Sequence, residues 1–213
     1  MTQDAMRWGP AAGPAHQLVV LLHGYGADGA DLIDLAPGWA QALPHAAFVA
    51  PHAPEPCGES GFGRQWFALW DRSEAARAAG ADVARIWLDA FIDAEMTRLG
   101  VSEYALMGFS QGAMMALHVG LRRVVPPRAV LAYSGRLLAA DRLGEATARP
   151  PVLLVHGEAD AVVPVQCSRD AAAALQAEGF DVNALFCPGL GHGLDEAGIS
   201  AGALALQKAF AGS

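Results

Sequence analysis

The segment Gly108-Phe109-Ser110-Gln111-Gly112 has the G-x-S-x-G pattern that surrounds a nucleophilic serine. It follows an apolar run at residues 104–107 and precedes a helical pattern at residues 113–117. Between a strand and a helix, such a serine occupies a sharp turn in which the flanking glycines leave room for the backbone. The pattern is short and glycine is abundant, so a chance match is the alternative, but the context favours Ser110 as a nucleophile.

A nucleophilic serine needs a base and a carboxylate, which in this arrangement follow it in the order acid, then histidine, at the carboxyl ends of strands. The apolar run 152–155 leads into a loop that contains Asp160, ahead of a helical segment. Glu158 competes with it in the same loop, whereas Asp181 and Asp195 lie in less suitable contexts. The sequence therefore predicts Asp160 as the acid.

His192 lies between Gly191 and Gly193, directly after the last apolar run, 182–186. A flexible loop at this place suits a histidine that must reach a serine on another strand. The six other histidines have weaker claims; His156, for example, only precedes the acid. We predict that Asp160 holds the Nδ1–H of His192, which leaves Nε2 to accept the Ser110 proton.

The loop Gly24-Tyr25-Gly26-Ala27-Asp28-Gly29 formally matches the G-x-G-x-x-G fingerprint of dinucleotide binding. That fingerprint also requires an acid about 20 residues later, at the end of the next strand. Here the nearest acid is Glu55, inside a proline-rich loop. In a hydrolase the same turn supplies an oxyanion N–H from Tyr25, which would act together with the N–H of Gln111. We favour the oxyanion interpretation and keep a dinucleotide-binding oxidoreductase, or a binding module using this loop, as the alternative.

Short apolar runs alternate with helical patterns along the whole chain, which predicts an α/β fold with a mostly parallel central sheet and helices on both faces. We expect one domain over residues 1–213, with a minimal cap or none, and with 1–16 as an N-terminal extension or an edge strand. On the helix at about 81–99 we expect Val83, Trp87 and Phe91 to face the core. Trp39, Trp70 and Met114 or Met115 are also expected in the core. The expected strands are 17–22, 46–50, 104–107, 129–133, 152–155 and 182–186, and the expected helices are 30–42, 81–99, 111–123, 165–178 and 198–210.

The composition excludes several classes of protein. A net charge of −8 disfavours nucleic acid and anionic lipid as partners. No apolar run is long enough to span a bilayer, and the first residues do not have the pattern of a secretory signal. The three cysteines have neither metal spacing nor the density of a disulfide scaffold. We therefore expect a cytoplasmic protein with no metal and no cofactor.

Four motifs together resemble the phospholipase/carboxylesterase family of small α/β-hydrolases, which includes the acyl-protein thioesterases. They are the segments 22–28, 108–112, 157–160 and 191–192. The resemblance extends from about Gln17 to Phe210 and implies the α/β-hydrolase fold. It implies Ser110, Asp160 and His192 as a catalytic triad, with oxyanion N–H groups from Tyr25 and Gln111. It also implies cofactor-free cleavage of fairly short esters, acyl thioesters or lysophospholipids.

The segment Arg64-Gln65-Trp66-Phe67 resembles the family's Trp-Phe segment near the acyl pocket, so Trp66 and Phe67 are candidate substrate contacts, with core packing as the alternative. Tyr25 stands where the acyl-protein thioesterases carry an apolar residue, and residues 68–72 depart from their Trp-Phe-Asp run. These departures weaken a claim to protein depalmitoylation. They favour a carboxylesterase for short to medium acyl chains, with a thioesterase or lysophospholipase as the alternative on the same site. A homodimer formed at an apolar rim, and an inactive scaffold, are the remaining hypotheses.

Overall fold

The computed structural model describes residues 4–58 and 62–211. Its centre is a seven-stranded sheet in the order β1-β3-β2-β6-β7-β8-β9. Six strands run parallel, and β1 pairs antiparallel with β3 at one edge. The strands are β1 (Ala5–Trp8), β2 (Gln17–Leu22), β3 (Ala46–Pro51), β6 (Tyr104–Phe109), β7 (Val130–Tyr133), β8 (Val152–Gly157) and β9 (Val182–Cys187).

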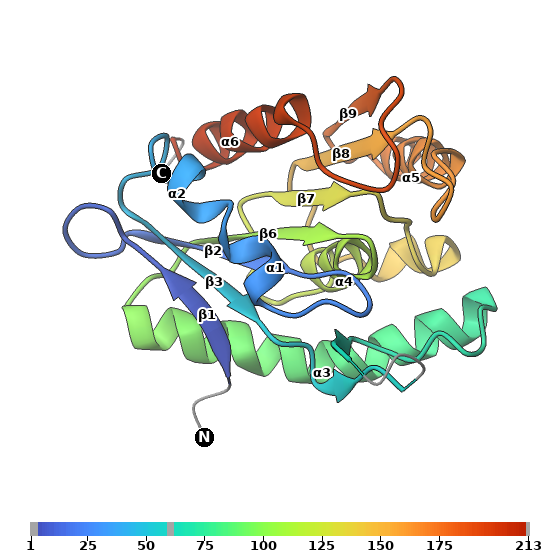
Figure 1. The fold of residues 1–213 in the computed structure, drawn as a ribbon, viewed down its shortest axis with the longest axis horizontal. Coiled ribbons are helices and arrows are strands. Elements are labelled where there is room, and N and C mark those ends of the chain that lie inside the picture. Colours follow the sequence, from blue (N-terminus) through green and yellow to red (C-terminus); the bar gives the residue numbers. More distant parts are fainter. Residues whose placement is uncertain (1–3, 59–61, 212–213) are drawn as a thin grey trace.

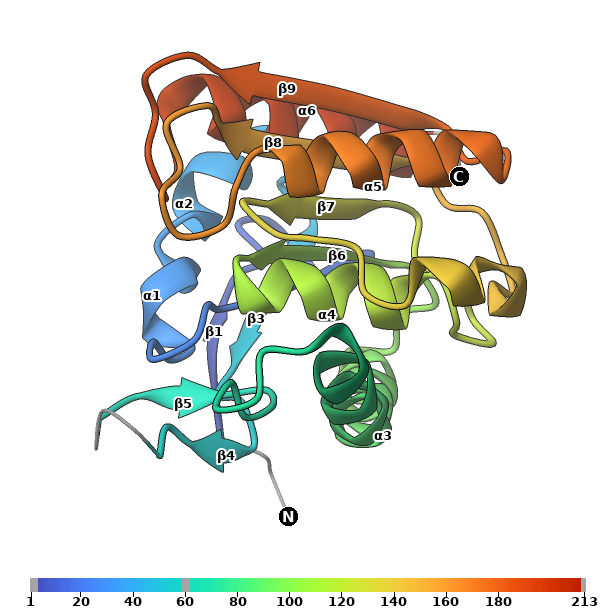
Figure 2. The ribbon, with the colours of Figure 1, turned by 90° about the vertical axis from the view of Figure 1, so that its right-hand side faces the viewer.

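Helices cover both faces of this sheet (Figures 1 and 2). One face carries α1 (Ala30–Ile33), α2 (Ala36–Trp39) and α6 (Glu196–Phe210), and the other carries α3 (Glu74–Leu99), α4 (Gln111–Gly120) and α5 (Gln166–Ala177). A 3-10 helix spans Ala140–Glu145, and a small hairpin pairs β4 (Glu55–Pro56) with β5 (Arg64–Gln65). The predicted fold class is therefore confirmed.

The alternation of side chains along the strands explains why both faces need cover. Leu18, Val20 and Leu22 of β2 pack into one core cluster, whereas Val19 and Leu21 pack into the other. Successive side chains of a strand point to opposite faces, so a strand that is apolar throughout must be buried on both. This burial is the physical reason for the near-continuous apolar runs in the sequence.

Two sequence-based expectations about the core are wrong. Trp70 is 79 % exposed, although Trp39, Met114 and Met115 are buried as expected. The predicted phase of α3 is also wrong at Val83, which is 69 % exposed, because the helix turns other residues to the sheet. Its buried side chains are Ala81, Ala84, Leu88, Phe91, Ile92 and Glu95.

The helix α3 also begins earlier than predicted, at Glu74 instead of about residue 81. The Ser73 hydroxyl accepts a hydrogen bond from the Ala76 N–H, which caps the helix and lets it begin at Glu74. In the part of the chain that the structure describes, no helix is long and apolar enough to cross a membrane.

Candidate active site

Ser110 lies at the turn between β6 and α4, with φ 54° and ψ −114°. A positive φ is uncommon for residues other than glycine and costs on the order of 1–3 kcal/mol. The Ser110 N–H donates to the Tyr133 carbonyl at 2.8 Å, which fixes the turn against β7. The sharp turn directs the side chain away from the sheet, as the motif predicts.

The two flanking glycines of the motif are required by close packing. A Cβ on Gly108 would overlap the Gly112 carbonyl, and a Cβ on Gly112 would overlap the Leu22 carbonyl of the neighbouring strand. The backbone of α4 therefore starts in contact with β2. Only glycine leaves room for this approach.

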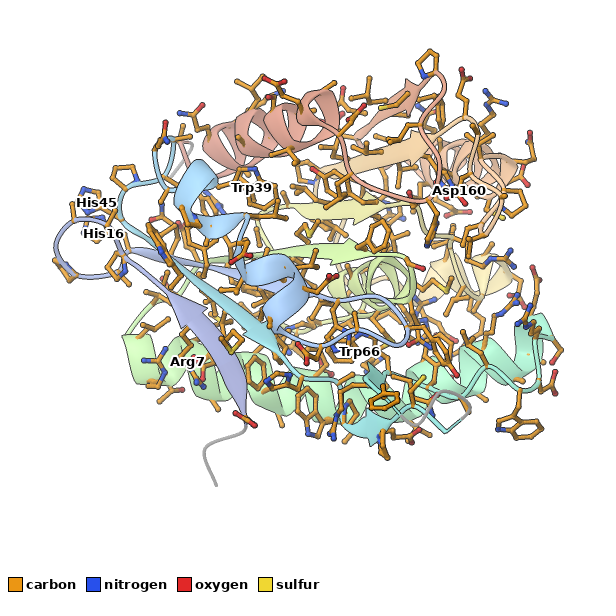
Figure 3. All side chains as sticks on the ribbon, viewed as in Figure 1. Arg7, His16, Trp39, His45, Trp66 and Asp160 are labelled. Atoms are coloured by element: carbon orange, nitrogen blue, oxygen red, sulfur yellow. The ribbon has the colours of Figure 1, made fainter. Side chains whose placement is uncertain are left out.

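Three side chains from different loops meet at the carboxyl ends of the strands. His192 Nε2 lies 3.0 Å from Ser110 Oγ, and His192 Nδ1 lies 2.7 Å from Asp160 Oδ2. Asp160 comes from the loop after β8 and His192 from the loop after β9; Figure 3 shows Asp160 at the edge where the strand arrows end. With Asp160 accepting the proton on Nδ1, Nε2 is free to accept from the serine hydroxyl. The structure thus brings together the three residues that the sequence selects.

Asp160 is surrounded by hydrogen-bond donors. Its Oδ1 accepts from the N–H groups of Val162 and Val163, both at 2.8 Å, and its Oδ2 accepts from His192. Burial alone would raise the pKa of Asp160, but the hydrogen bonds from His192 and the two backbone N–H groups outweigh it, and the pKa is lowered. The side chain is therefore ionised at neutral pH and holds the histidine in one orientation.

The competing carboxylates are engaged elsewhere. Glu158 pairs with Arg169 at 2.7 Å on the surface, and Asp195 Oδ1 accepts from the Gly198 N–H as the cap of α6. Asp181 precedes β9, at the opposite end of the sheet. None of these contacts involves the histidine next to Ser110.

His156, which is not among the predicted site residues, is a second histidine that lies next to Asp160. Its ring is fully buried, and Nε2 lies 2.8 Å from the Val163 carbonyl and 3.2 Å from Asp160 Oδ2. Nδ1 lies 2.7 Å from Ser168 Oγ. A proton on Nε2 is therefore donated to the Val163 carbonyl, and the carboxylate of Asp160 lies close to the same ring nitrogen. The signal in the sequence was its place at the end of β8, four residues before the acid.

The glycine loop after β2 packs directly against the nucleophile. A Cβ built on Gly24 would lie 3.4 Å from the Ser110 Cβ. His23, which is not among the predicted site residues, anchors the loop, because Nδ1 donates to the Gly24 carbonyl at 2.7 Å and Nε2 accepts from the Ala53 N–H at 3.0 Å. Burial lowers the pKa of His23, so the ring is neutral and can play both roles.

The geometry of the same loop does not fit a dinucleotide-binding site. The Gly29 N–H donates to His52 Nδ1 at 3.1 Å, and a Cβ on Gly29 would overlap the Ala50 carbonyl. The helix that follows, α1, has only four residues. A pyrophosphate site uses such N–H groups at the start of a full helix, so this geometry favours the hydrolase interpretation.

The side chain of Gln111 contributes to the site by holding the segment after β5. Its Oε1 accepts from the Trp66 N–H at 2.9 Å, and its Nε2 donates to the Phe67 carbonyl at 2.7 Å. The Trp66 indole N–H donates to the His23 carbonyl at 2.9 Å. Gln111, Trp66 and His23 thus tie the start of α4 to the glycine loop.

Trp66 and Phe67 are 1 % and 2 % exposed, which supports core packing for both. They also border a cavity of about 380 Å³ that reaches Trp70 and Trp87 but is not lined by Ser110, Asp160 or His192. Contact of Trp66 or Phe67 with a substrate remains a prediction. A second cavity, of about 840 Å³, lies at the amino ends of the strands against α6, away from Ser110.

A serine on a strained strand–helix turn, with a histidine that a buried carboxylate orients, is the arrangement of the α/β-hydrolase class of serine hydrolases. Residues 9–208 match the model of the phospholipase/carboxylesterase family, and the chain belongs to that family. The family resemblance drawn from the sequence is confirmed, and with it the class of enzyme, a serine hydrolase of the esterase/thioesterase family.

Three relatives illustrate the match. The chain is 30 % identical to esterase YpfH of Escherichia coli (strain K12), over 85 % of this chain and 78 % of that protein. It is 27 % identical to acyl-protein thioesterase 1 of Neurospora crassa, over 86 % and 82 % of the two chains. The crystal structure of esterase PE8 superposes with a TM-score of 0.92 at 41 % identity, covering 98 % and 99 %.

Proposed function

We propose that the protein is a carboxylesterase for short to medium acyl chains, and that Ser110, His192 and Asp160 are its catalytic triad. The observation that carries the proposal is the continuous pair of hydrogen bonds from Ser110 Oγ through His192 to Asp160, at 3.0 and 2.7 Å. The relatives named esterase support the reaction class.

In the first stage, Ser110 Oγ attacks the carbonyl carbon of the ester while His192 Nε2 takes the hydroxyl proton. The carbonyl oxygen becomes an oxyanion, and we assign its stabilisation to the backbone N–H groups of Gln111 and Tyr25. Gln111 begins α4, and the first N–H groups of a helix have no partner within it. His192 then returns the proton to the departing alcohol, which leaves the acyl group on Ser110.

In the second stage, His192 takes a proton from water, and the resulting hydroxide attacks the acyl carbonyl. The tetrahedral intermediate collapses, the acid departs, and the proton goes back to Ser110 Oγ. Asp160 stays ionised throughout, because its lowered pKa keeps it negative beside the transient imidazolium.

A thioester would react at the same atoms, because its thiol leaves in place of the alcohol. A relative is named acyl-protein thioesterase 1, which supports this second candidate activity. Lysophospholipids remain part of the same alternative. We also propose that the protein acts as a cytoplasmic enzyme, and that an apolar rim supports a homodimer.

The test is hydrolysis of p-nitrophenyl esters and of matched acyl thioesters of increasing chain length, by the wild-type protein and by Ser110→Ala. Ser134→Ala is the matched control, because Ser134 also has a positive φ, of 51°, and lies at the end of the neighbouring β7. We expect Ser110→Ala to keep the fold and lose hydrolysis, and Ser134→Ala to retain it. Undiminished hydrolysis by Ser110→Ala would refute the proposal.

A further inference from the structure

Most arginines of this chain have a clear partner. Of the thirteen arginines in the sequence, eight form an ion pair with a carboxylate within 4 Å. Two more, Arg64 and Arg149, donate to backbone carbonyls. The three that remain are Arg72, Arg77 and Arg136, for which no carboxylate or carbonyl partner is found among the described residues. In a chain with a net charge of −8, unpaired cations are the exception.

These three arginines belong to one neighbourhood. Arg72 and Arg77 flank the start of α3, and Arg136 lies in the loop after β7. Arg136 Nη2 contacts Cys167 Sγ at 3.2 Å, at the start of α5. Burial, and then the charges of Arg136 and Arg72, lower the pKa of Arg77, so both of these guanidinium groups repel that of Arg77.

The neighbourhood borders the candidate active site. Gly135, directly before Arg136, packs against the nucleophile turn: a Cβ built on it would lie 3.3 Å from the Ser110 carbonyl oxygen. The start of α3 lies on the side of the molecule toward which β6, β7 and β8 point (Figure 1). The loop after β7 therefore packs against the nucleophile turn, and Arg136 in this loop contacts the start of α5 and interacts through its charge with Arg77 of α3.

Arg77 has the strongest need of a partner. Its Nε is buried and makes no hydrogen bond within the described residues. A buried donor without a partner is costly, and two further positive charges nearby add repulsion. Asp71 and Glu74 are close enough to interact with Arg77 through their charge, but neither forms an ion pair with it within 4 Å. A bound anion would satisfy the donor and relieve the repulsion.

We propose that Arg72, Arg77 and Arg136 form a site for a carboxylate or phosphate group of the substrate, beside the bond that Ser110 cleaves. Arginine suits this role because its planar guanidinium can bind such a group through two parallel hydrogen bonds. The inference rests on the proposed esterase function and names a class of substrate for it: an acyl ester or thioester that carries a negative charge at a distance from the scissile carbonyl.

The anionic group has two possible sources, the acid half of the substrate or its leaving group. The first is tested with mono-p-nitrophenyl adipate against the neutral p-nitrophenyl heptanoate, which is similar in length. The second is tested with butyryl-coenzyme A, whose leaving group carries phosphates, against S-butyryl-N-acetylcysteamine. The measurement is the ratio of kcat/KM for the charged substrate to kcat/KM for its neutral counterpart.

Arg136→Met and Arg77→Met remove a charge while retaining a long side chain. Arg85→Met is the matched control, since Arg85 also lies on α3 but is paired with Asp89. We expect at least one wild-type ratio to exceed unity, and Arg136→Met and Arg77→Met to lower it by about tenfold or more, the usual worth of a hydrogen bond to a charged group. Arg136→Glu should lower it further, and Arg85→Met should leave it unchanged.

Binding gives a second readout, which does not depend on turnover. Calorimetric titration of Ser110→Ala with adipate and with coenzyme A should detect binding of the preferred anion, and Arg136→Met in that background should weaken it by a similar factor. Wild-type ratios near unity in both arms, or a preference that Arg136→Met and Arg77→Met leave intact, overturn the inference. Hydrolysis of p-nitrophenyl heptanoate would still support the esterase function in either case, whereas loss of all ester hydrolysis would count against the function itself.

Discussion

Replacing Asp160 by asparagine keeps the shape of the side chain but turns one of its two acceptor oxygens into a donor. In the wild-type protein Oδ1 accepts from the N–H groups of Val162 and Val163, and Oδ2 accepts from His192 and lies 3.2 Å from His156 Nε2. The amide has a single oxygen, so it can accept either from the backbone N–H groups or from His192, but not from both. The orientation of the amide therefore decides the effect on catalysis.

The energetics favour an amide oxygen that stays on the backbone. Turning the amide the other way would set its NH2 group against the N–H groups of Val162 and Val163, and each unsatisfied buried donor costs about 1–3 kcal/mol. With the oxygen on the backbone, the NH2 group faces His192 Nδ1, and the ring can adapt by moving its proton to Nε2. Nε2 of His192 then already carries a proton and cannot accept the proton of Ser110.

The expected loss in kcat/KM is about 10⁴-fold, the usual size of the effect when a triad histidine is held in the wrong tautomer. The assay is hydrolysis of p-nitrophenyl butyrate at pH 7.5, with a check that the fold is intact. Glu158→Gln is the control, because Glu158 lies in the same loop but forms only an exposed pair with Arg169, so its loss should change activity by less than about threefold. Asp160→Asn within tenfold of wild type would refute the assigned role of Asp160.

Three further outcomes follow from the site. Gly112→Ala should prevent or severely destabilise folding, measured by thermal unfolding, because its Cβ would overlap the rigid Leu22 carbonyl. His156→Asn should lower kcat about tenfold with little change in KM, and should shift the acid limb of the pH–rate profile, because the ring nitrogen that lies 3.2 Å from Asp160 Oδ2 is removed; an unchanged pH profile would leave His156 a structural role only. Since the pKa of Asp160 is lowered from 3.8, its ionised form stabilises the fold above that pH, and this contribution is lost as the pH falls through the lowered value. The difference in free energy of unfolding between wild type and Asp160→Asn, measured by denaturant titration, should therefore become smaller below about pH 3.8.

Ser110, Asp160 and His192 could be found from the sequence because each follows an apolar strand and they occur in a fixed order. The carboxyl ends of parallel strands lie at one edge of the sheet, so residues that directly follow these strands lie close together. The role of Gly108 and Gly112 could be predicted as well, because a sharp turn with close backbone packing requires residues without a Cβ. These inferences depend on backbone topology, which the alternation of strands and helices encodes.

The features that the sequence did not reveal depend on side-chain packing. The phase of α3 is difficult to predict because alanines lie all around the helix, so the sequence pattern does not separate the exposed Val83 from the buried Leu88. His156, whose ring lies beside Asp160, could not be separated from an ordinary buried histidine without knowing that Nε2 comes within 3.2 Å of the carboxylate. Trp70 is exposed although its size favours burial, and nothing in the neighbouring residues signalled this.

The most direct test of the central claim, that Ser110 is the nucleophile, is to label the wild-type protein with a fluorophosphonate and map the adduct by tandem mass spectrometry. The account predicts one adduct per chain, on the peptide that contains Ser110, with no adduct in Ser110→Ala and normal labelling in Ser134→Ala. An adduct on another residue, or labelling that persists in Ser110→Ala, would contradict it.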